Sequence, residues 1–386
     1  MSKFDRLPDR TGTGAYKWEA RTEAEKQNGI VAMSVADMEL PAPECVQEEI
    51  RRMTECGVYG YTSMDERYVL ALQSWMRSRH GWEVKKEEIV PIHGVVPAIA
   101  MCVQAYTQVS DGVIIQPPVY PPFRSVVNSN GRRVIENPLI YENGRYRMDY
   151  EDLAKKASDP RAKLLILCSP HNPVGRVWEK EELEKLHSIC AENGVMVVSD
   201  EIHFDLVKGA EHTVYAKVDP DAVVMTAPSK TFNVPGLSLS NMVIANEERR
   251  EAMKNTISAC GGSGVPYFGR AALCAAYEKG AEWLDEVLDY IQGNCDALEA
   301  FLAEHFPQVK LVSREGTYLL WADCTALGIP EEELLRFLRE EAGWIVQGGS
   351  GFGEQGRGFV RINAALPRPE LEKAMKRLLE AVEKRG

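Results

Sequence analysis

Five positions that can take part in chemistry each follow a run of strand-forming residues, namely Gly94, Tyr120, Asn172, Asp200 and Lys230. Ligands of open α/β sheets bind at the carboxyl ends of the parallel strands. Five such positions in one chain therefore predict one binding site at that edge of a sheet. Taken singly, each has an ordinary alternative, such as a solvated lysine, a turn asparagine or a core tyrosine.

The five residue types together match the needs of one cofactor. A lysine that forms a Schiff base needs an unprotonated amine, which a partly desolvated site provides. A buried aspartate can keep a heteroaromatic nitrogen protonated, because the ion pair offsets the cost of burial. Tyr120 offers a stacking ring, Asn172 an amide donor for a phenolate oxygen, and the helix start after Gly94 offers N–H groups for a phosphate. The set predicts pyridoxal 5′-phosphate.

The elements that must position these residues form an alternating pattern of apolar strands and helices. The strands lack polar alternation, which indicates a largely parallel sheet covered by helices on both faces. The expected strands are 89–92, 112–115, 133–135, 164–167, 195–198 and 223–225, and the expected helices are 44–55, 64–80, 95–109 and 179–193.

The last hundred residues change style and predict a smaller α+β unit. After a helical region over 265–304, strands are expected at 309–312, 316–321 and 358–363, with helices at 331–341 and 369–384. A short strand is expected at 31–38. The predicted fold class is α/β, with an N-terminal arm (1–40) that joins the small domain, a large domain (41–280) and a small C-terminal domain (281–386).

The composition excludes several classes of protein. The chain of 386 residues has 45% hydrophobic and 26% charged residues and a net charge of −12, which argues against nucleic-acid and acidic-membrane partners. Its nine cysteines show no C-x-x-C pair or metal-ligand spacing, which favours free thiols in a reducing compartment. With no apolar signal segment and no run of eighteen apolar residues, the expectation is a cytoplasmic protein without a metal.

Three short runs resemble the signatures of fold-type I pyridoxal-phosphate enzymes, the aspartate aminotransferase superfamily. They are 169–175 (SPHNPVG), 199–203 (SDEIH) and 229–233 (SKTFN). Three further runs, 35–38 (VADM), 316–319 (GTYL) and 358–363 (GFVRIN), are similar to the subgroup of MalY/PatB-type cystathionine β-lyases, which includes cystalysin. The resemblance implies the transferase-like fold of these enzymes and a homodimer with its active sites at the interface.

The resemblance also implies roles for the cofactor-binding residues. Lys230 would bond to the cofactor and later move protons, Asp200 would pair with the pyridinium nitrogen, and Asn172 would bond the 3-oxygen. Tyr120 would stack on the ring. The phosphate would lie against Gly94, Val95 and Ser229.

The substrate side of the predicted site comes from other segments. Arg361 would bind the α-carboxylate of an amino acid through its planar fork. Asp37, Met38 and Tyr120 would complete the substrate site, and Tyr61 would reach it from the other subunit. His203 is a further candidate for cofactor contact, with a purely structural histidine as its alternative.

Two departures from the transaminase pattern favour the lyase subgroup. Transaminases carry an arginine eight residues after the lysine, where this chain has Ser238, and a tyrosine three residues after the aspartate, where it has His203. The run 351–356 (GFGEQG) fits a dinucleotide-binding pattern, but no helix is expected after it, so it predicts a flexible loop.

The expected activity is α,β-elimination from a sulfur amino acid such as L-cystathionine, L-cysteine or an S-substituted cysteine, giving a thiol, pyruvate and ammonia. A thiolate is a competent leaving group, since a thiol has a pKa of about 8.5. An aminotransferase with the same cofactor is the first alternative. A regulatory or binding protein that keeps the cofactor site is the second.

Overall fold

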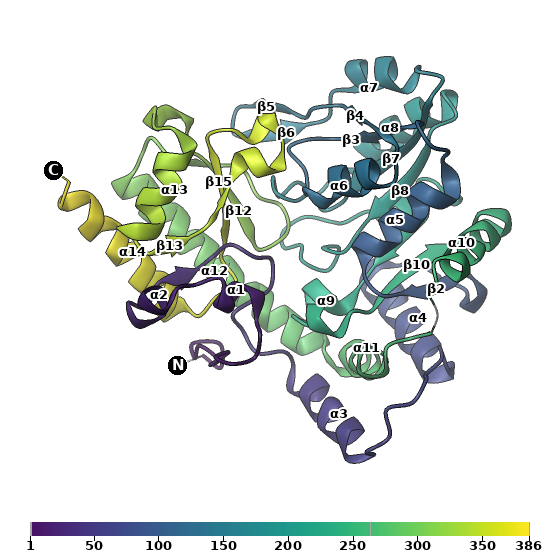
Figure 1. The fold of residues 1–386 in the computed structure, drawn as a ribbon, viewed down its shortest axis with the longest axis horizontal. Helices are drawn as coiled ribbons and strands as arrows, with labels where there is room; N and C mark the ends of the chain where they lie inside the picture. The colour runs from purple at the N-terminus through teal and green to yellow at the C-terminus, as the bar shows by residue number, and fades with distance from the viewer. Residues whose placement is uncertain (1, 263, 386) are drawn as a thin grey trace.

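The computed structural model describes residues 2–262 and 264–385 and is built around a seven-stranded sheet (Figure 1). The order of the strands is β2-β10-β9-β8-β7-β3-β4. Their bounds are β2 (Ile89–Ile92), β3 (Gly112–Ile115), β4 (Arg133–Glu136), β7 (Ala162–Cys168), β8 (Met196–Asp200), β9 (Val223–Thr226) and β10 (Ser240–Ile244).

Most of the sheet is parallel, as predicted. The neighbours from β9 to β4 all pair in parallel. Strand β10 runs antiparallel to both β2 and β9. The sequence analysis missed this strand, because only Met242, Val243 and Ile244 form its apolar run and the polar pair Ser240-Asn241 begins it.

Helices cover both faces of the sheet. Along β7, Leu164 and Ile166 join one apolar cluster while Leu165 and Leu167 join the other. This strand is therefore buried on both sides, which explains why its sequence lacks polar alternation. The first face carries α5 (Val95–Tyr106), α6 (Pro122–Ser129) and α10 (Glu247–Ala259). The second carries α4 (Glu66–His80), α7 (Tyr150–Ala157), α8 (Lys180–Glu192) and α11 (Tyr267–Lys279), with α3 (Glu44–Glu55) packed against α11.

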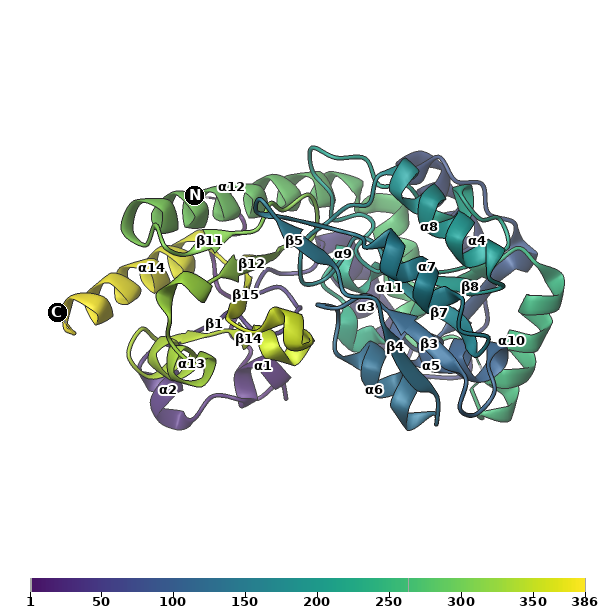
Figure 2. The ribbon, with the colours of Figure 1, turned by 90° about the horizontal axis from the view of Figure 1, so that it is seen from above.

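A smaller α+β unit lies beside this layer, and the 25-residue helix α12 (Ala281–His305) runs from one to the other (Figure 2). Its antiparallel sheet has the order β11-β12-β15-β14. The bounds are β11 (Lys310–Leu311), β12 (Leu319–Asp323), β14 (Gln347–Gly348), β15 (Phe359–Asn363), α13 (Glu331–Glu340) and α14 (Arg368–Glu383).

The N-terminal arm joins the small unit through strand pairing. Strand β1 (Val31–Ala32) pairs in parallel with β13 (Trp344–Ile345). The arm also carries the short helices α1 (Tyr16–Glu19) and α2 (Glu23–Gln27). The predicted domain borders near 40 and 280 stay a prediction, while the α/β fold class with a second α+β unit is confirmed.

Two local expectations differ from the structure. Residues 34–38 were expected to form part of a strand, but they form an irregular segment, which we call the strap. Side chains, and not a neighbouring strand, bond its backbone groups. Asn363 Nδ2, for example, donates to the carbonyls of Val35 and Asp37 at 2.7 and 2.8 Å. The expected flexible loop at 351–356 instead contains two short 3₁₀ helices, η5 (Gly349–Phe352) and η6 (Glu354–Gly356). Among the described residues, no helix has the length and apolarity needed to cross a membrane.

Candidate active site

A cavity of about 200 Å³ opens at the carboxyl ends of the parallel strands. Eight of the predicted site residues share its wall, although they come from distant parts of the sequence. They are Gly94, Val95, Tyr120, Asn172, Asp200, His203, Ser229 and Lys230. Five of them, Gly94, Tyr120, Asn172, Asp200 and Lys230, are the residues expected to meet at this edge of the sheet.

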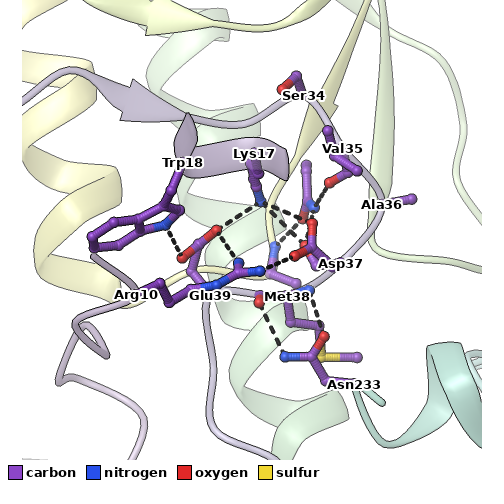
Figure 3. A network of polar contacts seen from close by, with 12 residues as sticks. Arg10, Lys17, Trp18, Ser34, Val35, Ala36, Asp37, Met38, Glu39 and Asn233 are labelled. Atoms are coloured by element: carbon purple, nitrogen blue, oxygen red, sulfur yellow. Dashed lines mark hydrogen bonds and ion pairs between the residues drawn. The ribbon is translucent and has the colours of Figure 1, made fainter. Parts of the chain in front are cut away.

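Four predicted residues lie outside this wall. Arg361 reaches its edge, since its Nη1 donates to Asn172 Oδ1 at 2.9 Å. Asp37 and Met38 belong to the strap, and the Asp37 carboxylate faces the N-terminal arm (Figure 3). Tyr61 lies beyond α3 with its side chain fully exposed.

Lys230 sits in the short helix α9 (Pro228–Thr231), which follows β9 directly. Its Nζ donates to the Ala36 carbonyl of the strap at 2.7 Å. The pKa of the amine is lowered to about 8, mainly by burial; the Asp37 and Asp200 charges raise it, and the Arg361 and Lys17 charges lower it. The amine therefore loses its proton at a lower pH than an ordinary lysine does, and its unprotonated form can act as a nucleophile.

Asp200 ends β8 and lies at the floor of the cavity, where it is 5% exposed. Its Oδ1 accepts the Ile202 N–H at 3.1 Å. The pKa of this carboxyl is raised to about 7, mainly by burial; the Glu201 charge also raises it, while the Ile202 N–H and the Lys230 charge lower it. A buried carboxylate of this kind fits a protonated ring nitrogen, which would supply the missing counter-charge.

His203 is the third titratable group in the cavity. The pKa of its imidazole is lowered to about 3, mainly by burial and also by the Lys230 and Arg361 charges. The ring is therefore neutral at physiological pH. Within the described residues its Nδ1 is buried without a hydrogen-bond partner, so it has capacity to bond a polar ligand atom.

The wall also contains a cradle suited to a phosphate. Gly94 has a φ of 112°, a backbone conformation that favours glycine, and it precedes the first turn of α5. N–H groups of a first helical turn attract anions. The hydroxyl residues Ser229, Ser238 and Ser240 line the same wall. Where transaminases place an arginine, this chain offers a helix start and hydroxyls.

Arg361 is held in β15 as a buried guanidinium, 3% exposed. Its Nη2 donates to the Ser34 carbonyl at 2.9 Å and also to Gln347. Burial lowers its pKa to about 10. In the described chain its Nε has no partner, so the group has spare capacity for a carboxylate ligand.

The residue that anchors α9 was not predicted from the sequence. The Asp205 carboxylate accepts bonds from Thr231 Oγ1 at 2.8 Å, His80 Nε2 at 2.7 Å and Trp75 Nε1 at 3.1 Å. It thereby ties the turn that carries Lys230 to α4. A signal for it exists, because a lone aspartate between Phe204 and Leu206 needs buried partners.

Taken together, the donor set fits pyridoxal 5′-phosphate. A lysine amine with a lowered pKa, a buried carboxylate, an aromatic face at Tyr120 and an anion cradle share one cavity. The Tyr120 ring is braced edge-on by Phe123, with centroids 6.0 Å apart. These are the groups that such a cofactor requires of a protein.

Comparison with known proteins gives a consistent result. The family model described as aminotransferase class I and II matches residues 29–378. Cystathionine beta-lyase PatB of Bacillus subtilis (strain 168) is 41% identical over 384 residues, covering 98% of this chain and 99% of PatB. Protein MalY of Escherichia coli (strain K12) is 30% identical over 386 residues, with 99% of both chains covered.

Comparison with solved structures points to the same group of proteins. Cystalysin from Treponema denticola, which contains a pyridoxal 5′-phosphate cofactor, superposes with a TM-score of 0.96 at 36% identity, covering 100% of both chains. The pyridoxal-phosphate-bound C–S lyase from Staphylococcus hominis has a TM-score of 0.91 at 33% identity, covering 98% of both. The chain therefore belongs to the aminotransferase class I and II family, in the group of PatB, MalY and cystalysin.

Proposed function

We propose that this protein is a pyridoxal-phosphate-dependent carbon–sulfur β-lyase that acts on L-cystathionine, L-cysteine or S-substituted cysteines. The observation that carries the proposal is the meeting of the Lys230 amine and the Asp200 carboxylate in one cavity, with Arg361 at its edge. The cystathionine β-lyases and C–S lyases among its relatives support this choice of reaction.

The residues divide the work of binding. Asp200 would keep a proton on the ring nitrogen, Asn172 and His203 would bond the 3-oxygen, and Tyr120 would stack on the ring. Gly94, Val95 and Ser229 would hold the phosphate, with further hydroxyls from Ser238 and Ser240. On the substrate side, Arg361 binds the α-carboxylate and the strap residues Asp37 and Met38 border the site.

When bound, the cofactor supplies a carbonyl for amines and a protonated ring that withdraws electrons from Cα. Lys230 would supply the amine that holds the cofactor, and its lowered pKa would make it a base able to take the Cα proton. Arg361 orients the substrate by its carboxylate. The strap and the buried wall limit the access of water to this proton.

The overall reaction balances as elimination followed by hydrolysis. The Cα–H and Cβ–S bonds break, the sulfur leaves as a thiol after gaining a proton, and one water is consumed. Cystathionine gives homocysteine, pyruvate and ammonia, and cysteine gives sulfide in place of homocysteine.

We further propose a homodimer in which Tyr61 serves the site of the other subunit. Its fully exposed side chain lies in a loop with exposed Val58 and Tyr59, as an interface residue would. The nine free cysteines fit a reducing compartment, and we place the protein in the cytoplasm.

The test of the activity is a panel of S-substituted cysteines incubated with the holoenzyme and no added 2-oxo acid. Pyruvate release from the panel supports the lyase. Turnover that requires 2-oxoglutarate and yields glutamate instead identifies an aminotransferase and overturns the proposal. Lys230→Ala serves as the inactive control.

A further inference from the structure

A buried ionic cluster joins the N-terminal arm to the residues around the strap (Figure 3). We call it the arm–strap network, and it consists of Arg10, Lys17, Trp18, Asp37 and Glu39. Arg10 bridges the two carboxylates, with Nη2 2.7 Å from Asp37 Oδ2 and Nη1 2.9 Å from Glu39 Oε1. Trp18 Nε1 donates to Glu39 Oε2 at 2.9 Å.

Lys17 is the most enclosed member of this network. It is 3% exposed, and its Nζ lies 3.3 Å from Glu39 Oε1 and donates to the Asp37 carbonyl at 3.1 Å. Two cations face two carboxylates, so the cluster is neutral as a whole. A lysine this buried requires such partners, because an unpaired buried charge is very costly.

The same strap carries the two carbonyls that meet the cations of the active site. The Ser34 carbonyl accepts from Arg361 Nη2 at 2.9 Å, and the Ala36 carbonyl accepts from Lys230 Nζ at 2.7 Å. Tyr318 Oη also donates to Ala36 at 2.8 Å. The position of the strap therefore decides where the substrate-binding guanidinium and the nucleophilic amine rest.

We infer that Arg10 and Lys17 are positioning residues, which hold the strap so that the Ser34 and Ala36 carbonyls orient Arg361 and Lys230. Neither arm residue lines the cavity, and each acts through Asp37 and Glu39. The inference rests on the proposed function for the identity of the substrate. It does not depend on which reaction follows binding.

Electrostatics gives the network a second route to Lys230. The Asp37 charge raises the pKa of the Lys230 amine, and the Lys17 charge lowers it. Removing the Lys17 cation should therefore favour protonation of the nitrogen at position 230. A role confined to fold stability would leave that protonation unchanged.

The test compares the holoenzyme with its Lys17→Met variant by two spectroscopic measurements. The first is the Kd of L-alanine, followed by the absorbance of the bound cofactor, which reports amino-acid binding without elimination because alanine has no leaving group on Cβ. The second is the pH midpoint of that absorbance. We expect about a tenfold weaker Kd, and an upward shift of the midpoint by about half a unit, as for loss of a nearby cation.

A matched control is Lys26→Met, which removes a lysine from the same arm. Lys26 pairs with Glu23 at 2.9 Å and with Glu19 at 3.6 Å, neither of which belongs to the arm–strap network, and its loss should leave both measurements unchanged. A wild-type Kd and midpoint in Lys17→Met would overturn the inference, even if its melting temperature falls. Equal effects in Lys26→Met would overturn it too.

If Lys17→Met does not fold, the double variant Lys17→Met/Glu39→Gln keeps one cation against one carboxylate. A weakened L-alanine Kd in this variant supports the inference, and a wild-type Kd contradicts it. Failure of the proposed function shows separately, as a wild-type enzyme that binds L-alanine but releases no pyruvate from cystathionine.

Discussion

Burial lowers the pKa of the Lys230 amine more than any neighbouring charge does. The Lys230 amine thus becomes a nucleophile mainly because the site excludes water. The carboxylates of Asp37 and Asp200 offset only part of the fall in its pKa. The same burial raises the pKa of Asp200 to about 7 and lowers that of His203 to about 3. The low dielectric constant of one cavity thus shifts the pKa values of a lysine, an aspartate and a histidine.

A lysine with a lowered pKa destabilises the apoprotein. The direction in which stability changes with pH follows from the number of protons that the folded and unfolded chains bind. The pKa falls from 10.5 to about 8 on folding, so the unfolded chain binds more protons between these values. Stability therefore rises with pH over this window, and below pH 8 the cost is about 3 kcal/mol. We predict that apo Lys230→Met is more stable than the apo wild type at pH 7.

Urea unfolding of the two apoproteins from pH 7 to pH 10.5 measures this difference. The stability advantage of Lys230→Met over the wild type should shrink steadily above pH 8 and approach a constant near pH 10.5. An advantage that does not change with pH would show that the amine keeps an ordinary pKa in the folded chain. Lys208→Met, at a surface lysine that is 40% exposed, is the control.

Arg361 is predicted to act through its fork rather than through charge alone. Arg361→Lys keeps the charge but loses the bonds to Asn172 and Ser34. Because charge-assisted hydrogen bonds contribute about 1.5–3 kcal/mol, KM for L-cystathionine should rise about tenfold to a hundredfold, with a smaller change in kcat. Steady-state kinetics decide this. A fall in kcat at constant KM would assign Arg361 a different role.

At the scale of elements, the short helix α9 depends on a residue of another segment. Asp205 bonds Thr231 of α9 and both Trp75 and His80 of α4. Asp205→Ala would leave three buried donors without an acceptor. We predict a loss of about 3 kcal/mol in the free energy of unfolding, together with weaker cofactor retention.

Denaturant unfolding of the holoenzyme and equilibrium dialysis of the cofactor check this prediction. Asp289→Ala is the control, because Asp289 is 70% exposed and its surface ion pair contributes little. If both variants lose the same stability, Asp205 has no special part in holding α9.

The sequence predicted the elements whose pattern is strongly periodic and missed those that side chains organise. Helix α3 occupies the predicted residues 44–55, because its amphipathic spacing is regular. The strap was predicted as a strand, since its apolar letters fit one, but Asn363 and Asn233 bond its backbone instead. Strand β10 was missed because it begins with polar residues.

In the candidate site, too, some residues could be predicted from the sequence and others could not. Lys230, Asp200 and Asn172 could be predicted because each lies at the carboxyl end of a buried strand or within four residues after it. Arg10 and Lys17 could not, because their partners lie 20 to 29 residues away in the sequence and only the folded chain brings them together. Motifs reveal groups that touch the ligand, and the residues that hold those groups emerge from packing.

At the scale of the whole molecule, the proposed homodimer makes a prediction about shared sites. Lys230→Ala disables the site of its own chain, and Tyr61→Ala would disable the site of its partner. A hybrid dimer then keeps one intact site. Random pairing of equal amounts of the two variants should restore about one quarter of the wild-type activity, as twofold symmetry requires.

Mixing the variants after reversible dissociation, followed by an activity assay, gives the answer. No recovery would mean that Tyr61 serves its own chain or no site at all. Sedimentation of the mixture confirms that dimers have formed again. Tyr16→Ala, at another highly exposed tyrosine, should retain full activity without being mixed with a second variant.

Counting the products that the holoenzyme makes from L-cystathionine without a 2-oxo acid distinguishes a β-lyase from an aminotransferase. We expect homocysteine, pyruvate and ammonia in equal amounts from the wild type, and none from Lys230→Ala. Absence of pyruvate from the wild type, with glutamate appearing only when 2-oxoglutarate is added, would contradict this expectation.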